Sequence, residues 1–218
     1  RLNNSLDTTR SFLQESSHVI ITLGTAWGYI LNQDERLVAN CHKVAQSNFT
    51  KKIFSSEEIK KSLAEICNII WKLNKDVKII FTVSPVRHLK DGFVENQLSK
   101  ANLITALHEY RKELKLKFDK KTKYFPSYEI VMDELRDYRF YDKDMIHLSE
   151  IGIDYIWGRF KESWIAPEVF SIMKEVNSIQ KGLEHRPFNE DSPQHREFLE
   201  KLSLRIEKLQ VKIPSVKF

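Results

Sequence analysis

The chain has 218 residues, enough for one large domain, and its 41% hydrophobic and 30% charged residues are typical of globular proteins. No apolar run approaches the ~20 residues that span a bilayer, and the first residues lack a signal-peptide pattern, so we expect a cytoplasmic location and no membrane partner. The net charge of +5 comes from Lys and Arg residues spread along the chain, unlike the concentrated basic surface of a nucleic-acid-binding protein. Cys41 and Cys67 are too few for a disulfide framework or a zinc site, and they favour a reducing compartment.

The first part of the chain predicts a helix, a strand and a small hairpin, in that order. Residues 6–15 have the pattern of a short helix. Residues 18–24 form an apolar run that ends in glycine, which is typical of a buried parallel strand. Residues 27–31 and 36–41 are expected to pair as a hairpin around the polar residues between them.

The middle of the chain predicts a helix, a second buried strand and another helix. The segment Ser55-Ser-Glu-Glu58 is a capping box that opens a helix to about Asn74. The apolar stripe of this helix is predicted to consist of Ile59, Leu63, Ile66, Ile70 and Leu73. Residues 77–83 form a second buried strand, closed by Ser84-Pro85, and a helix is expected over about 96–118.

The remaining elements complete an alternation of strands and helices. Tyr124-Phe125 indicates a weak third strand, residues 126–135 a helix with proline in its first turn, and Ser149 a cap for a helix to about Trp164. This order predicts a three-layer α/β sandwich with parallel strands, in which ligands bind at the carboxyl ends of the strands. Three strands make a thin sheet, and apolar strands need partners at their edges, so we expect the chain to begin in the middle of a fold.

After Pro167 the composition changes, and two further helices are predicted over 168–182 and about 193–211. We therefore divide the chain into an α/β domain over residues 1–165 and a C-terminal helical extension over 166–218. The extension is expected to pack on the core or on a partner chain, so homo-oligomerisation through its helices is one interpretation.

Asp144-Met-Ile-His147 is the segment with the clearest chemical meaning. An Asp three residues before a His lets the carboxylate accept from one imidazole nitrogen while the other nitrogen faces a nucleophile. The structural interpretation is an ordinary Asp–His contact at a helix start, or an Asp that serves the helix N-terminus. No convincing activated Ser accompanies the pair, because Ser84 is followed by Pro85 and lacks the glycines of a nucleophile elbow.

Several blocks of the chain, in order from about residue 13 to residue 160, resemble the GSCFA-domain family, which belongs with the SGNH (GDSL-like) hydrolases. They are Ile20-Ile-Thr-Leu-Gly-Thr-Ala-Trp27, Ala39-Asn-Cys-His-Lys43, Thr82-Val-Ser-Pro-Val-Arg-His88, Phe125-Pro-Ser-Tyr-Glu-Ile130, Asp133-Glu-Leu-Arg-Asp-Tyr-Arg-Phe-Tyr141 and the Asp144–His147 segment. The resemblance implies a flavodoxin-like sheet of SGNH-hydrolase type, an esterase-type Ser hydrolase, and a dyad of Asp144 and His147.

The Gly-Ser-Cys-Phe-Ala block for which the family is named resembles the nucleophile block of SGNH enzymes, and Gly-Ser-Cys does not occur here. We therefore expect an N-terminally incomplete fold whose central first strand and Ser lie upstream, or else a remnant that has lost its nucleophile.

Candidate pocket residues follow the two predicted strands. By the resemblance, Gly24-Thr25-Ala26-Trp27 stands where SGNH enzymes carry Gly-x-Asn-Asp. Ala26 has no side-chain donor, so the oxyanion hole is expected to depend on backbone N–H groups or on another side chain, for which Thr25 and Asn40 are candidates. The structural interpretation of Gly24 is a tight turn after a strand. Asn40 and His42 would share one face of an extended segment and line the pocket, or simply belong to the hairpin.

Arg87 and His88 follow the second strand and complete the predicted pocket. Arg87 is expected to hold an anionic or sugar group of a substrate, or to pair with an acid of residues 133–137. Those acids and Asp142 lack the spacing of a calcium-binding loop, so we expect no metal site.

The predicted activity is hydrolysis or transfer of an acyl ester, such as an acetyl ester of a small molecule or carbohydrate, without a cofactor. The alternative is a non-catalytic binding module that retains the pocket.

Overall fold

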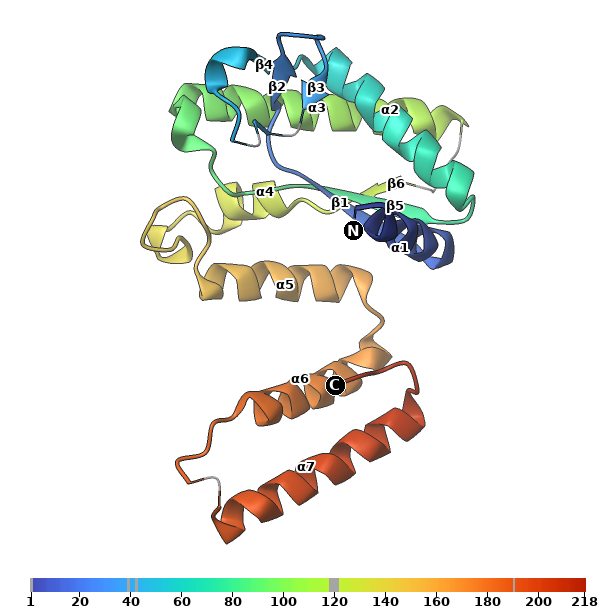
Figure 1. Cartoon of the computed structure of the whole chain (residues 1–218), viewed down its shortest axis with the longest axis vertical. Coiled ribbons are helices and arrows are strands. Elements are labelled where there is room, and N and C mark those ends of the chain that lie inside the picture. The colour runs from blue at the N-terminus through green and yellow to red at the C-terminus, as the bar shows by residue number, and fades with distance from the viewer. Residues whose placement is uncertain (1, 39, 42, 118–121, 190) are drawn as a thin grey trace. The chain divides into compact units, whose positions relative to one another are not determined.

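A parallel sheet forms the centre of the first part of the chain. The computed structural model describes residues 2–38, 40–41, 43–117, 122–189 and 191–218. Strands β1 (His18–Leu23), β5 (Lys78–Val83) and β6 (Thr122–Tyr124) pair in parallel in the order β1-β5-β6 (Figure 1). Residues 79–83 of the central strand β5 are all buried. The parallel α/β sheet predicted from the alternation of strands and helices is therefore confirmed.

Strand β1 differs from its prediction as a buried strand, because only one of its faces is covered. Val19, Ile21 and Leu23 pack against the core, whereas Ile20, on the other face, is 53% exposed. In the described chain β1 also has a partner on one edge only, which is β5. An apolar strand in this position presents both unpaired backbone groups and apolar side chains to a further partner.

Helices α2 (Ser56–Leu73) and α3 (Phe93–Lys117) lie together along one side of this sheet (Figure 1). The buried residues of α2 are Ile59, Leu63, Cys67 and Ile70. Ile66 was predicted to belong to this stripe but is 39% exposed. The reason is helical geometry: position 67 lies four residues after Leu63 and three before Ile70, so it continues the buried stripe, and position 66 lies about 100° to one side.

The predicted capping box at the start of α2 is present. Ser55 Oγ accepts from the backbone N–H of Glu58 at 3.3 Å, and Glu58 Oε2 accepts from the backbone N–H of Ser55 at 2.9 Å. The two side chains therefore satisfy donors that the first turn of a helix otherwise leaves without partners.

Replacing Ser55 with alanine is expected to lower the free energy of unfolding by ~1 kcal/mol, because the N-cap acceptor is lost. Urea unfolding monitored by circular dichroism measures this change. Ser56→Ala is the matched control, because Ser56 is the first helical residue and does not cap. An equal effect of both substitutions would show that the cap does not stabilise α2.

A second sheet is antiparallel and contains β2 (Trp27–Leu31), β3 (Leu37–Val38) and β4 (Phe49–Ile53) in the order β3-β2-β4. The predicted hairpin corresponds to β2 and β3, with a shorter second strand. Strand β4, which follows the 3-10 turn η1 (Gln46–Asn48), was not predicted. Its polar residues Thr50 and Lys52 are exposed while Phe49 and Ile53 are half-buried, so the strand is amphipathic but too short and charged to stand out in the sequence.

Other elements connect and cover the parallel sheet. Helix α1 (Leu2–Glu15) ends where the side-chain amide of Asn74 donates to the carbonyls of residues 13, 14 and 16. The predicted helix at 126–135 is divided into a short α4 (Ser127–Glu129) and a π-helical turn, η3 (Ile130–Glu134). Ser127 is buried, and its hydroxyl donates to the carbonyl of Val83 at 2.7 Å, which joins α4 to the end of β5.

The chain divides into two compact units, Arg1–Trp157 and Gly158–Phe218, with the boundary inside α5 (Glu150–Trp164). The second unit contains the 3-10 turn η5 (Pro167–Val169), α6 (Phe170–Glu184) and α7 (Pro193–Lys212). Its core consists of the buried residues Ile179, Leu202 and Leu209 with partly buried neighbours. Within the described ranges, no helix combines the length and the apolar character needed to cross a bilayer.

Candidate functional site

The carboxyl ends of β1 and β5 lie side by side. The backbone N–H of Ser84 donates to the carbonyl of Leu23 at 2.9 Å. The Lys100 amine, which extends from α3, donates to the carbonyls of Gly24 at 2.6 Å and Ser84 at 2.7 Å. Lys100 is only 1% exposed, and burial lowers the pKa of its amine to about 8. One buried amine therefore joins the two strand ends where ligands bind in such folds.

Asp144 and His147 form the predicted pair. His147 Nδ1 lies 2.6 Å from Asp144 Oδ2, and Asp144 Oδ1 accepts from the backbone N–H groups of Ile146 at 2.8 Å and His147 at 2.9 Å. The imidazole hydrogen bond, followed by these backbone bonds, lowers the pKa of the Asp144 carboxyl to about 2. Because the carboxylate is ionised at neutral pH, it accepts the Nδ1 proton and leaves Nε2 as the nitrogen that can act as a base.

The local backbone explains why these residues point toward each other. They lie in the loop between the 3-10 turn η4 (Tyr138–Phe140) and α5. Met145 adopts a φ of 59°, in the left-handed region, and the backbone N–H of Asp142 donates to the carbonyl of His147 at 2.9 Å. Ser149 Oγ also donates to the carbonyl of Arg139 at 3.0 Å. The side-chain and backbone bonds close the loop around the Asp144 carboxylate.

Arg87 connects the loop between η4 and α5, which carries Asp144 and His147 and is called the dyad loop below, to the segment after β5. Its backbone N–H donates to the carbonyl of Ile146 at 3.3 Å, and its Nη1 donates to the carbonyl of Met145 at 3.1 Å. The guanidinium carbon lies 4.0 Å from the ring centroid of Tyr141. Since Arg87 follows Ser84-Pro85 directly at the end of β5, the dyad loop and the strand ends share one edge of the sheet.

Gly24 and His88 also meet at this edge. A Cβ atom on Gly24 would lie 3.6 Å from His88 Nε2, an ordinary van der Waals distance, so the ring lies close to the backbone at the end of β1. Burial and, next, the charge of Lys100 lower the pKa of His88, while Asp91 acts in the opposite direction. The His88 imidazole is therefore held in its neutral form beside the end of β1.

Thr25 has a structural role at the end of β1. Its hydroxyl lies 3.0 Å from Ser99 Oγ and accepts from the backbone N–H of Trp27 at 3.2 Å. The backbone N–H of Ala26 donates to Ser99 Oγ at 2.7 Å. These bonds tie the end of the strand to α3, and the geometry gives no support to Thr25 as an oxyanion donor.

The predicted pair of Asn40 and His42 is described only in part. Asn40 is exposed and follows β3, while His42 lies outside the described residues. That the side chains of Asn40 and His42 share one face of an extended segment remains a prediction.

The neighbouring Cys41 is half-buried and free. Cys67 is a buried free thiol, and burial raises its pKa to about 11. Cys67 is therefore a protonated core residue and not a nucleophile.

Sequence reasoning missed the polar face of α3 that supports the site. Asn96, Ser99 and Lys100 are all buried, and the side-chain oxygen of Asn96 accepts from the backbone N–H of His88 at 2.8 Å. A signal was present, because these three residues continue at helical spacing the stripe formed by Leu103 and Leu107. Polar residues that extend an apolar stripe toward one end of a helix predict buried polar contacts there.

Comparison with protein families gave two matches. A model described as the GSCFA family matches residues 1–160, and a model described as the GSCFA domain protein, C-terminal domain, matches residues 176–218. Comparison with curated proteins and with solved structures gave no match.

Proposed function

The chain belongs to the GSCFA family, and on this premise we propose that it is a Ser-dependent ester hydrolase of the SGNH type. The observation that carries the proposal is the 2.6 Å contact of His147 Nδ1 with Asp144, in a loop that Arg87 fastens to the end of β5. His147 Nε2 takes the proton of the attacking Ser hydroxyl and later returns it to the leaving alcohol. Asp144 holds the imidazole in the required tautomer and stabilises its charged form.

The open edge of β1 is where we place the nucleophile. Ile20 is exposed on this strand, and β1 pairs with β5 alone in the described chain. A strand that paired there would end beside Gly24 and His88, at the same edge of the sheet as the dyad loop. The GSCFA resemblance implies that the strand with the Ser block occupies this position. Backbone N–H groups near that strand end would then supply the oxyanion donors, since Ala26 has no polar side chain.

A non-catalytic binding module is the second candidate. The observation that favours it is the use of the Ala26 backbone N–H by Ser99, which removes one donor from the end of β1. A module of this kind would retain the strand ends, Arg87 and the Asp144–His147 contact, and would bind an ester or its product without cleaving it.

Labelling with a fluorophosphonate, which reacts with activated serines, separates the two candidates. The protein expressed from its own gene, with any residues that precede Arg1, is expected to hydrolyse 4-nitrophenyl acetate and to carry the label on a Ser outside residues 1–218. Mass spectrometry of the labelled peptides locates the modified residue. A label on Ser84 would contradict the proposed nucleophile, and binding of the ester without labelling or hydrolysis would favour the binding module.

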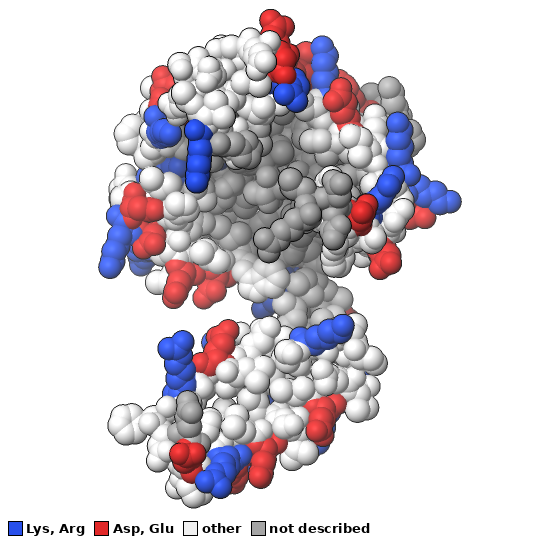
Figure 2. Space-filling view, in the orientation of Figure 1, with Lys and Arg blue, Asp and Glu red and all other residues white. Residues whose placement is uncertain are grey.

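We extend the proposal to substrate, location and partners. The substrate is an acyl ester of a small molecule or carbohydrate, and the reaction requires no cofactor. On the face shown in Figure 2, Lys and Arg alternate with Asp and Glu on the described surface, which supports the proposal that nucleic acid is not a partner. We place the protein in the cytoplasm, and we propose α6 and α7 as the surface for pairing with a second copy.

A further inference from the structure

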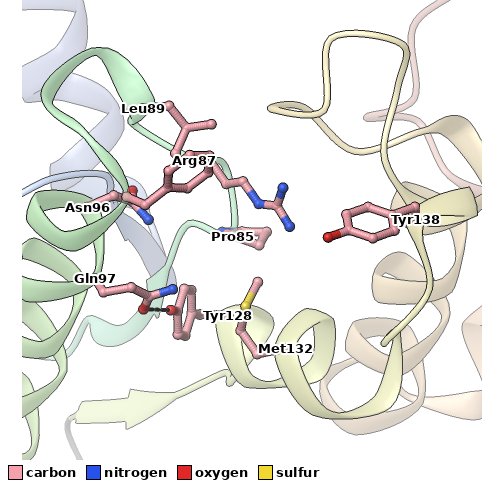
Figure 3. Close-up of a pocket in the computed structure, with 9 residues that line it drawn as sticks. Pro85, Arg87, Leu89, Asn96, Gln97, Tyr128, Met132 and Tyr138 are labelled. Atoms are coloured by element: carbon pink, nitrogen blue, oxygen red, sulfur yellow. Dashed lines mark hydrogen bonds between the residues drawn. The ribbon is translucent and has the colours of Figure 1, made fainter.

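A cavity of about 210 Å³ adjoins the dyad loop. It lies among the segment after β5, the beginning of α3 and the residues of α4, η3 and η4. Its lining comprises Pro85, Arg87, Leu89, Phe93, Asn96, Gln97, Tyr128, Met132 and Tyr138 (Figure 3). A second cavity of about 330 Å³ shares Arg87, Met132 and Tyr138 with the first.

Arg87 presents an unused edge of its guanidinium to these cavities. Nη1 donates to the carbonyl of Met145 at 3.1 Å. Within the described ranges, Nε and Nη2 have no hydrogen-bond acceptor and no carboxylate lies within ion-pair distance of the guanidinium. The predicted alternative, pairing with an acid of residues 133–137, is therefore not the arrangement found. Asp133 pairs with Arg136 and Asp137 with Arg139.

The other polar groups of the first cavity add hydrogen-bond donors. The side-chain oxygen of Asn96 already accepts from the backbone N–H of His88, and that of Gln97 accepts from the Tyr128 hydroxyl at 2.8 Å. Each amide therefore retains its NH₂ group for a ligand. In Figure 3 the Tyr138 hydroxyl points toward the Arg87 guanidinium across the cavity. Among the described residues, those that line this cavity include no Asp or Glu, whereas Arg136 and Asp137 line the second cavity.

The guanidinium of Arg87 and the side-chain amides beside it suit an anionic group that can accept hydrogen bonds through two oxygens. The Nε and Nη2 hydrogens of an arginine lie parallel, at a spacing that suits both oxygens of a carboxylate or two oxygens of a phosphate. The ring of Tyr141, with its centroid 4.0 Å from the guanidinium carbon, makes a cation–π contact that favours this position of the side chain. The cavity lies next to the loop that carries His147, because Arg87 lines the cavity and donates to the carbonyls of Met145 and Ile146.

Resting on the proposed function, we infer that Arg87, with Asn96 and Gln97, forms a subsite for a carboxylate or phosphate on the ester substrate. The substrate class is then an acyl ester whose alcohol carries a negative group. The neutral cavity walls, Pro85, Leu89 and Met132, would contact the part of the molecule between this group and the ester.

Matched acetate esters test the subsite. 4-Acetoxybenzoate and 4-acetoxybenzamide have the same shape and differ in charge, and 4-acetoxyphenyl phosphate distinguishes a phosphate from a carboxylate. The parent protein is expected to show a kcat/KM at least tenfold higher for one of the anionic esters than for the amide. Arg87→Gln should abolish this preference. The variant also loses the bond to the carbonyl of Met145, so the rate should fall for all three esters, and the ratio of the anionic to the neutral ester measures the subsite. Arg87→Lys keeps the charge but loses the two-donor edge, so it should retain only part of the preference.

Lys90→Gln is the matched control, because it removes one positive charge from an exposed residue of the same segment that does not line the cavity. It should keep the full preference. Hydrolysis of all three esters without preference, or an equal loss with charged and neutral esters in Arg87→Gln, would overturn the subsite while leaving the hydrolase assignment intact.

Calorimetry separates failure of the subsite from failure of the proposed function. If no ester is hydrolysed, titration with 4-hydroxybenzoate and with 4-hydroxyphenyl phosphate still measures the subsite. Binding of either compound to the parent protein that is lost in Arg87→Gln and kept in Lys90→Gln would support it. Absence of binding by both compounds would overturn it.

Discussion

Replacing His147 with alanine is expected to reduce kcat for acetyl-ester hydrolysis by about 10³-fold or more, because the base that activates the nucleophile is removed. The affinity for an ester should change little, since the imidazole contacts Asp144 and is 64% exposed in its side chain. Steady-state assays with 4-nitrophenyl acetate measure kcat and KM for the parent and the variant. A stability measurement by thermal unfolding should give similar midpoints for the two proteins, because both partners lie on an exposed loop.

Asp144→Asn provides the companion to this variant. The carboxylate accepts three hydrogen bonds, two from backbone N–H groups and one from His147. An asparagine has one acceptor oxygen, so it can serve either the loop backbone or the imidazole, and kcat should fall by about 10²- to 10⁴-fold.

His185→Ala is the control for general effects of removing a histidine, because His185 lies in the second unit. It should retain the activity of the parent. Activity of His147→Ala equal to that of the parent would remove the general-base assignment.

Replacing Lys100 with methionine is expected to lower the free energy of unfolding by about 1–3 kcal/mol at pH 7, because the carbonyls of Gly24 and Ser84 lose their shared donor. Methionine fills the space of the aliphatic stem, so the cavity cost is small. The loss of two hydrogen bonds from a charged donor outweighs the relief from burying a cation, which opposes it.

The stability difference between the parent and Lys100→Met is also expected to depend on pH. The pKa of Lys100 falls from 10.5 to about 8 on folding. Between these values the unfolded chain binds a proton that the folded chain does not, so raising the pH disfavours unfolding. The advantage of the parent over Lys100→Met should therefore grow between about pH 8 and pH 10.5, by up to ~3 kcal/mol at 1.36 kcal/mol per pKa unit.

Urea unfolding of both proteins at several pH values from 7 to 10.5 measures this difference. The other titratable groups are the same in both proteins, so the comparison isolates the contribution of Lys100. Lys90→Met serves as the control for replacing a lysine with methionine, because Lys90 is exposed. A Lys100→Met difference that is constant or shrinks with rising pH would contradict a buried, proton-releasing lysine.

Much of the parallel sheet and its helices could be predicted because local patterns determine them. Residues 18–24 and 77–83 are continuous apolar runs, and both form strands of the parallel sheet. The capping box at Ser55 starts α2 at the predicted place. Strand β4 was missed because its short alternation includes Lys51 and Lys52, and charged residues at a sheet edge resemble a loop.

The candidate site was predictable only where its residues are neighbours in the chain. Asp144 and His147 are three residues apart, and the loop between them suffices to bring the carboxylate to the imidazole. Lys100 and Gly24, by contrast, are 76 residues apart, and nothing in either segment alone indicates the other.

The sequence by itself determined the alternation of strands and helices, the helix caps and the spacing of Asp144 and His147, because these depend on interactions within a few residues. Only the tertiary structure decided that α3 places a buried amine between two strand ends and that one face of β1 stays uncovered. It also decided that the unused N–H groups of the Arg87 guanidinium face a cavity. The physical reason is that burial, shared hydrogen-bond partners and unpaired charge depend on segments that meet only after the sheet and its helices have assembled.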